Sequence, residues 1–169
     1  MKSLTVLRHA KSSWDDPVAD FDRQLNERGR KAAVAVGEEL KRRGTKFDCV
    51  IASPAKRVRE TLDQLGKGYG EPLDVHFDER IYLASEDNLL DLVRGIPDDV
   101  GSALIVGHNP GLHRLALLLI RDEGELRQRI ADKYPTAAAA TVELAADRWT
   151  EIEPGSGELS ALILPRDLD

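Results

Sequence analysis

The sequence predicts an α/β protein, a three-layer α/β/α sandwich built on a mostly parallel sheet with an antiparallel edge strand. Short apolar runs of strand length alternate with segments in which apolar residues recur every three or four positions. This alternation is typical of parallel sheets that helices cover on both faces. The last two apolar runs have no clear helix between them, which predicts antiparallel pairing at the edge. Because the 169 residues contain no linker, we expect one domain over residues 1–169.

The first half of the chain supplies three of the predicted strands and two of the helices. We expect the strands at residues 4–7, 49–52 and 73–77. Asn26 is placed to cap a helix that ends near residue 43, where Gly44 stops it. Ser53 and Pro54 are the expected cap and first residue of the next helix. That helix should reach about residue 65, because glycines in the segment 66–70 break it.

The second half continues the alternation and then changes character. A helix is expected at residues 86–95, a strand at 103–106, and a further helix that Pro110 opens. The charged stretch 121–133 should be a solvated helix or a loop. Residues 139–144 and 160–164 are the expected late strands.

Charge and composition exclude several classes of protein. Lys and Arg number 24 against 30 Asp and Glu, which gives a formal net charge of −6. An acidic chain is unsuited to general nucleic-acid binding or to docking on anionic lipid. No apolar run approaches the length of about 18 residues that a membrane span needs. We therefore expect a cytoplasmic protein with neither nucleic acid nor membrane as a partner, and a monomer is the simplest expectation.

Basic side chains follow three of the predicted strands. Arg8 and His9 come directly after the first strand, Arg57 lies one turn into the helix after the second, and His108 and Asn109 follow the fourth. In open α/β sheets, ligands bind beyond the carboxyl ends of the strands. Grouped basic side chains next to buried strands are costly unless something anionic meets them. The sequence therefore predicts an anion site at this edge.

The residue types favour phosphoryl transfer at that site. Arginine forks match phosphoryl oxygens with paired, charge-assisted hydrogen bonds. A neutral imidazole can attack phosphorus and hold the phosphoryl group, and a second, protonated histidine would stabilise the developing charge. A P-loop motif is absent from the sequence. No cluster of carboxylates with metal-binding spacing follows these strands, so we expect neither a metal nor a cofactor.

Three motifs resemble those of the histidine phosphatase superfamily, also called the phosphoglycerate-mutase-like superfamily. They are Leu-Arg-His-Ala at 7–10, Ser-Pro-Ala-Lys-Arg at 53–57 and Gly-His-Asn-Pro-Gly at 107–111. Ala10 stands where most of the superfamily has glycine. The segments 8–14, 20–29 and 135–137 make the chain similar to the small SixA-like phosphohistidine phosphatase branch. The resemblance spans residues 4 to about 164.

The resemblance implies a role for each matching residue. His9 would be the nucleophile that becomes phosphohistidine. Arg8 and Arg57 would clamp the phosphoryl oxygens, and His108 would complete the cationic pocket. Asn109 would donate a hydrogen bond beside it.

The same resemblance points to a second group of residues at the edge of the pocket. Lys11 and Ser12 would rim it as substrate-binding residues. In larger members of the superfamily a glutamate after the third strand protonates the leaving oxygen, and Glu79 is the nearest match here. Asp78 and Glu86 are rival positions for that general acid.

Three functions follow as hypotheses. The leading one is a metal-independent phosphatase that forms phosphohistidine on His9 and acts on a phosphorylated protein, with protein phosphohistidine as the substrate. The short connections between elements favour a protein side chain, because they leave the site open. A phosphatase acting on a small phosphate ester is the alternative within the enzymes, and a non-catalytic phosphate-binding module is the alternative outside them. His76 and His113 have no assigned role.

Overall fold

The computed structural model describes residues 1–168 and contains one six-stranded sheet. The strand order is β3-β2-β4-β1-β5-β6. The strands are β1 (Lys2–Arg8), β2 (Cys49–Ala52), β3 (Val75–Phe77), β4 (Ser102–Gly107), β5 (Ala139–Leu144) and β6 (Gly157–Ile163). The first four pair in parallel, whereas β5 runs antiparallel to both β1 and β6. This arrangement confirms the predicted fold class.

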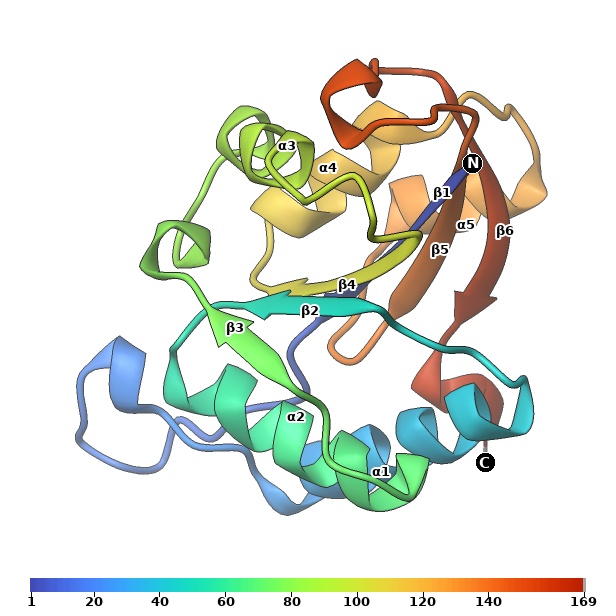
Figure 1. Cartoon of the computed structure of the whole chain (residues 1–169). Coiled ribbons are helices and arrows are strands. Elements are labelled where there is room, and N and C mark those ends of the chain that lie inside the picture. The colour runs from blue at the N-terminus through green and yellow to red at the C-terminus, as the bar shows by residue number, and fades with distance from the viewer. Residues whose placement is uncertain (169) are drawn as a thin grey trace.

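Helices cover both faces of the sheet, as Figure 1 shows. The helices are α1 (Glu27–Arg42), α2 (Lys56–Tyr69), α3 (Glu86–Arg94), α4 (Gly111–Leu119) and α5 (Glu125–Asp132). Helices α1 and α2 pack on one face, and α3 and α4 lie on the other, with α5 beside α4. The core is correspondingly divided: Leu4 and Val6 of β1 belong to the cluster under α3 and α4, and Leu7 to the cluster under α1 and α2. Alternate side chains of one strand thus serve both layers.

The start of α1 agrees with the sequence, because the Asn26 side chain accepts a hydrogen bond from Gly29 N at 2.8 Å. The expected course of α2 was wrong at both ends. Its first residue is Lys56. The Ser53 side chain does not cap the helix; its hydroxyl only accepts a hydrogen bond from Ala55 N. The helix also continues through Gly66 and Gly68 to Tyr69 and ends at Gly70, whose φ of 92° lies in the left-handed region.

The charged stretch 121–133, for which the sequence allows either a helix or a loop, contains α5, of which only Ile130 is buried. Two short 3-10 helices flank the strand ends on the site side, η1 (Asp20–Asp22) and η2 (Glu79–Ile81). Two more lie later in the chain, η3 (Trp149–Glu151) and η4 (Pro165–Leu168). None of the helices formed by residues 1–168 is long and apolar enough to cross a membrane.

Strand register places three chain segments side by side at the carboxyl edge. Arg8 of β1 pairs with Gly107 of β4, and Ala52 of β2 pairs with Val106 of β4. The ladder extends one residue further, with His9 N donating to the Gly107 carbonyl at 3.0 Å and Ser53 N to the Val106 carbonyl at 3.1 Å. The residues after β1, β2 and β4 therefore emerge together.

Candidate active site

His9 lies at the base of a buried cluster, with 7% of its surface exposed. Its Nδ1 is 2.7 Å from the Ala10 carbonyl oxygen. A carbonyl oxygen only accepts hydrogen bonds, so Nδ1 carries the proton of the neutral ring. The lone pair is then on Nε2, which faces Arg57 Nε at 3.4 Å. This nitrogen is available as a nucleophile.

The surroundings of His9 keep its ring neutral. Burial lowers the pKa of His9 to about 3, and the positive charges of Arg57 and Arg8, and of His108 when it is protonated, act in the same direction. The hydrogen bond to the Ala10 carbonyl opposes this shift but does not reverse it. A neutral ring with an unprotonated Nε2 is the protonation state that nucleophilic attack requires.

Arg57, in the first turn of α2, connects the parts of the site. Its Nη2 lies 3.2 Å from His108 Nδ1 and 3.1 Å from Asp20 Oδ2. Its Nη1 donates to the Asp20 backbone carbonyl at 2.7 Å. Together with the contact from Nε to His9, one planar guanidinium group reaches two histidines and an acidic residue. The fixed fork of arginine makes this possible.

His108 follows β4 and faces His9, with the two ring centroids 5.4 Å apart. Its Nε2 is 2.8 Å from Ser53 Oγ, so Ser53 belongs to the site although the sequence assigned it only to a helix start. Burial, followed by the charge of Arg57, lowers the pKa of His108 to about 4. The second histidine, which was expected to be protonated, is therefore neutral in the free site, because it is buried and lies beside the charge of Arg57. A bound phosphoryl dianion would raise this pKa again.

Arg8 and Asn109 share one anchor beside this pair. The Tyr134 carbonyl accepts from Arg8 Nη1 at 3.1 Å and from Asn109 Nδ2 at 2.9 Å. Within residues 1–168, Arg8 Nε and Asn109 Oδ1 are buried without a hydrogen-bond partner. Burial and the charge of Arg57 lower the pKa of Arg8 from its ordinary value. An unpaired guanidinium N–H in a cationic pocket favours an anionic ligand there.

The structure does not bring the remaining predicted residues into this cluster. The Lys11 side chain is exposed. Ser12 is buried, but its hydroxyl accepts a hydrogen bond from Arg23 Nη2 and so supports the loop. Glu79 is exposed in η2, and its rival Asp78 bonds to Arg80.

Sequence reasoning missed two groups that do reach the cluster, Asp20 and Tyr82. The Tyr82 hydroxyl donates to Asp20 Oδ2, and the Tyr82 ring stands edge-on to His108 with centroids 5.3 Å apart. Asp20 lies in η1, far along the chain from both partners. No pattern in the sequence marks a contact between residues 62 positions apart.

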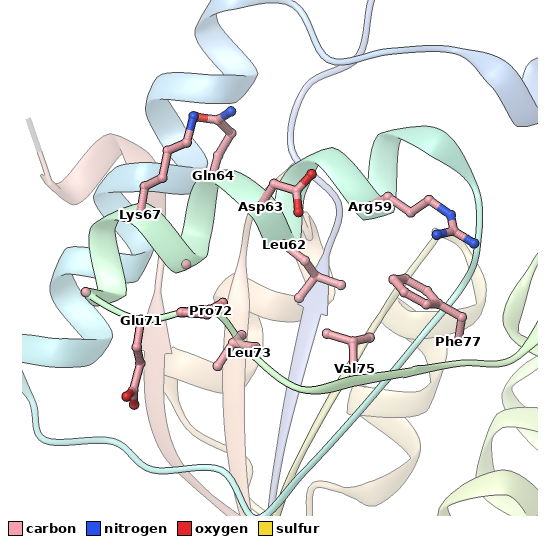
Figure 2. Close-up of a pocket in the computed structure, with 12 residues that line it drawn as sticks. Arg59, Leu62, Asp63, Gln64, Lys67, Glu71, Pro72, Leu73, Val75 and Phe77 are labelled. Atoms are coloured by element: carbon pink, nitrogen blue, oxygen red, sulfur yellow. The ribbon is translucent and has the colours of Figure 1, made fainter.

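A cavity of about 940 Å³ lies elsewhere, between α2 and β3. Figure 2 shows its lining, in which the Arg59 guanidinium stands over the Phe77 ring, 4.2 Å from the centroid. The residues around His9 and His108 form what we call the histidine cluster, and none of them lines this cavity. Among residues 1–168, no three His, Cys, Asp or Glu side chains are grouped so that they could hold a metal ion.

Comparisons with known proteins agree with this geometry. Residues 4–82 match the family model described as histidine phosphatase superfamily (branch 1). An uncharacterized protein of Mycobacterium leprae is 37% identical over 166 residues, which cover 95% of this chain and 100% of the relative. A structure assigned as the phosphohistidine phosphatase SixA of Nakamurella multipartitia is similar with a TM-score of 0.82 and 27% identity, over 97% of this chain and 96% of that one. The equivalent structure from Agrobacterium tumefaciens gives 0.81 and 26%, over 97% and 98%.

Proposed function

The chain belongs to the histidine phosphatase superfamily and is SixA-like, and on that premise we propose that it hydrolyses protein phosphohistidine, without a metal, through a phosphorylated His9. The family identifies a phosphatase, a hydrolase of phosphorylated substrates. The covalent intermediate on His9 and the protein substrate are our proposal and go beyond what membership of the family implies.

The observation that carries the proposal is the orientation of the His9 ring. The bond from Nδ1 to the Ala10 carbonyl leaves Nε2 unprotonated and directed at the cationic side of the cluster. Attack by Nε2 on phosphorus forms a P–N bond as the bond to the leaving group breaks. Water then attacks the phosphoryl group, which releases phosphate and restores the free ring.

The neighbours of His9 provide the electrostatic part of catalysis. Arg8 and Arg57 bind the phosphoryl oxygens, and His108, held by Ser53, faces the same group. Asn109 contributes through the amide that it anchors on Tyr134. We propose no contact with the phosphoryl group for Lys11 and Ser12, which belong to the loop around the entrance of the pocket.

Glu79 remains our prediction for a general acid by position alone. A protonated phosphohistidine ring, however, leaves as neutral imidazole and needs no proton from the enzyme. This property favours phosphohistidine over alkyl phosphates, whose leaving oxygen must be protonated.

The deciding experiment compares His9→Ala with the wild-type chain. The variant should lose turnover of both p-nitrophenyl phosphate and a phosphohistidine protein, and EDTA should leave the wild-type rates unchanged. A phosphoenzyme trapped from the wild-type chain should be labile in acid and stable in alkali. Turnover by His9→Ala at the wild-type rate would contradict the nucleophile. Faster wild-type turnover of sugar or nucleotide phosphates than of the phosphoprotein would favour the small-molecule alternative.

A further inference from the structure

Asp20 is held at the histidine cluster by donors from two other parts of the chain and by Arg23 at the end of its own 3-10 helix. Its Oδ2 accepts from Arg57 Nη2 at 3.1 Å and from the Tyr82 hydroxyl, and its Oδ1 accepts from Arg23 Nη1 at 3.0 Å. The Asp20 carbonyl accepts from Arg57 Nη1 at 2.7 Å. A carboxylate with this many donors has a fixed position, although it lies in a loop between β1 and α1.

The carboxylate lies on the solvent side of Arg57. The Arg57 side chain is 5% exposed, whereas that of Asp20 is 45% exposed. His9 is buried beneath, so it attacks a phosphoryl group from the protein side. In phosphoryl transfer the attacking and leaving atoms lie roughly in line with phosphorus. The leaving group must therefore depart outward, past the rim that carries Asp20.

The rim carries the Asp20 carboxylate, paired with Arg23 and Arg57, above a pocket that is positive. The hydrogen bond from Tyr82, followed by those from Arg23 and Arg57, lowers the pKa of Asp20 to about 2. The carboxylate is therefore ionised at neutral pH and holds no proton to donate. Asp15 and Asp16 of the same loop are exposed and carry charge of the same sign.

We infer that Asp20 determines specificity, by favouring substrates in which the phosphoryl group is attached to a cation, namely a protonated phosphohistidine ring. The inference rests on the proposed function and narrows it to one charge state of the substrate. The arginines and histidines meet the phosphoryl oxygens, and the Asp20 carboxylate meets the positive ring. An anionic leaving group is repelled at the same place.

The chemistry balances without a proton from the enzyme. His9 Nε2 forms the new P–N bond, and the electron pair of the old P–N bond moves to the substrate ring. The ring keeps the proton on its other nitrogen and leaves as neutral imidazole. Because its positive charge is lost as the bond breaks, Asp20 stabilises the bound substrate more than the transition state. Its effect should therefore be larger in KM than in kcat.

The test is the ratio of two kcat/KM values in Asp20→Asn, one for a phosphohistidine peptide and one for p-nitrophenyl phosphate. Measured near pH 6, where an imidazole is largely protonated, this ratio should fall about tenfold from the wild-type ratio, mainly through KM for the peptide. Asp22→Asn is the matched control, because Asp22 lies in the same 3-10 helix and its carboxylate makes none of the contacts of Asp20. Its ratio should equal the wild-type ratio.

Two outcomes would overturn the inference. An unchanged ratio with both rates reduced would mean that Asp20 only positions Arg57. A higher ratio would mean that the Asp20 carboxylate does not favour a cationic leaving group.

Failure of the proposed function is a separate result. If the wild-type chain hydrolyses p-nitrophenyl phosphate but not the peptide, the phosphohistidine substrate is wrong. The charge preference is then read from competitive inhibition by phosphocholine, whose alcohol carries a cationic ammonium group, and by phosphoglycolate, whose alcohol carries an anionic carboxylate. Asp20→Asn should weaken inhibition by phosphocholine relative to phosphoglycolate, and an unchanged ratio of the two Ki values would refute the preference.

Discussion

Arg57 is the single residue on which most contacts of the site converge. Its guanidinium group reaches His9, His108 and Asp20 at the same time. A lysine at this position would keep the charge, but its donors all sit on one nitrogen, which cannot reach partners on separate sides of a planar guanidinium. We expect Arg57→Lys to lower kcat/KM for p-nitrophenyl phosphate by about 100-fold or more, because misplacement of a phosphoryl clamp has costs of that order.

Arg59 offers a matched control for this substitution. It lies two residues further along α2, and its guanidinium stands over Phe77 in the separate cavity. Arg59→Lys should leave kcat/KM near the wild-type value, and thermal unfolding of both variants reports on the fold. Equal activity losses in the two variants would show that any arginine change in α2 disturbs the enzyme. That result would contradict a specific role of Arg57.

Which residues of the site the sequence could predict depends on how each one is positioned. Arg8 ends a buried strand, and His9 and His108 directly follow theirs, so the topology of a parallel sheet is enough to place them together. Asp20 and Tyr82 come from loops whose path depends on packing, which sequence patterns do not describe. Ser53 precedes a proline, a pattern typical of a helix start, so the sequence predicted it as a helix cap and not as a residue of the site.

The packing of α1 on α2 shows why glycine was misread as a helix breaker. A Cβ on Gly68 would lie 2.0 Å from the Val34 carbonyl oxygen, and one on Gly37 would lie 2.1 Å from the Leu65 carbonyl oxygen. The glycines therefore permit close backbone approach between the two helices. A periodic pattern predicts the existence of a helix well, but it does not separate a glycine that ends a helix from one that a neighbour contacts.

Gly68→Ala tests this account of the helix pair. Alanine is the better helix former by about 1 kcal/mol, yet its Cβ would meet backbone that cannot move aside as a side chain can. We expect the clash to dominate and to lower the free energy of unfolding by about 2 kcal/mol, within the range for overpacking. Urea unfolding measures the change.

Gly124→Ala is the control for that substitution, since nothing lies within 4 Å of its added Cβ. Its free energy of unfolding should stay within about 1 kcal/mol of the wild-type value. A Gly68→Ala chain at least as stable as the wild type would show that the helices separate at little cost.

The charge of the molecule as a whole conceals the character of the site. The net charge is −6, yet the pocket places Arg8 and Arg57 beside two histidines. The low pKa values of His9 and His108 are a consequence of burial, to which that concentration of positive charge adds. A net charge bears on the partners of the whole surface, but it gives no measure of the local field in one pocket.

The same pKa values predict how stability depends on pH. His9 and His108 titrate at about 3 and about 4 in the folded chain, against an ordinary value near 6.5 in the unfolded chain. Between pH 6.5 and 4 the unfolded state binds more protons, so the free energy of unfolding falls as the pH falls. Each histidine contributes a slope of up to about 1.4 kcal/mol per pH unit in that window.

Urea unfolding at pH 7, 6 and 5 measures this slope in the wild type and in the double variant His9→Asn and His108→Asn. The double variant should show a flatter dependence, because asparagine does not titrate, while His76 and His113 are common to both chains. Below pH 4 both chains should lose stability further, because Asp20, with its pKa of about 2, is ionised only in the folded state there. Parallel curves between pH 7 and 5 would place the pH sensitivity outside the site. A flatter double-variant curve would show that the cationic pocket, which suits the protein to phosphate, also makes it sensitive to acid.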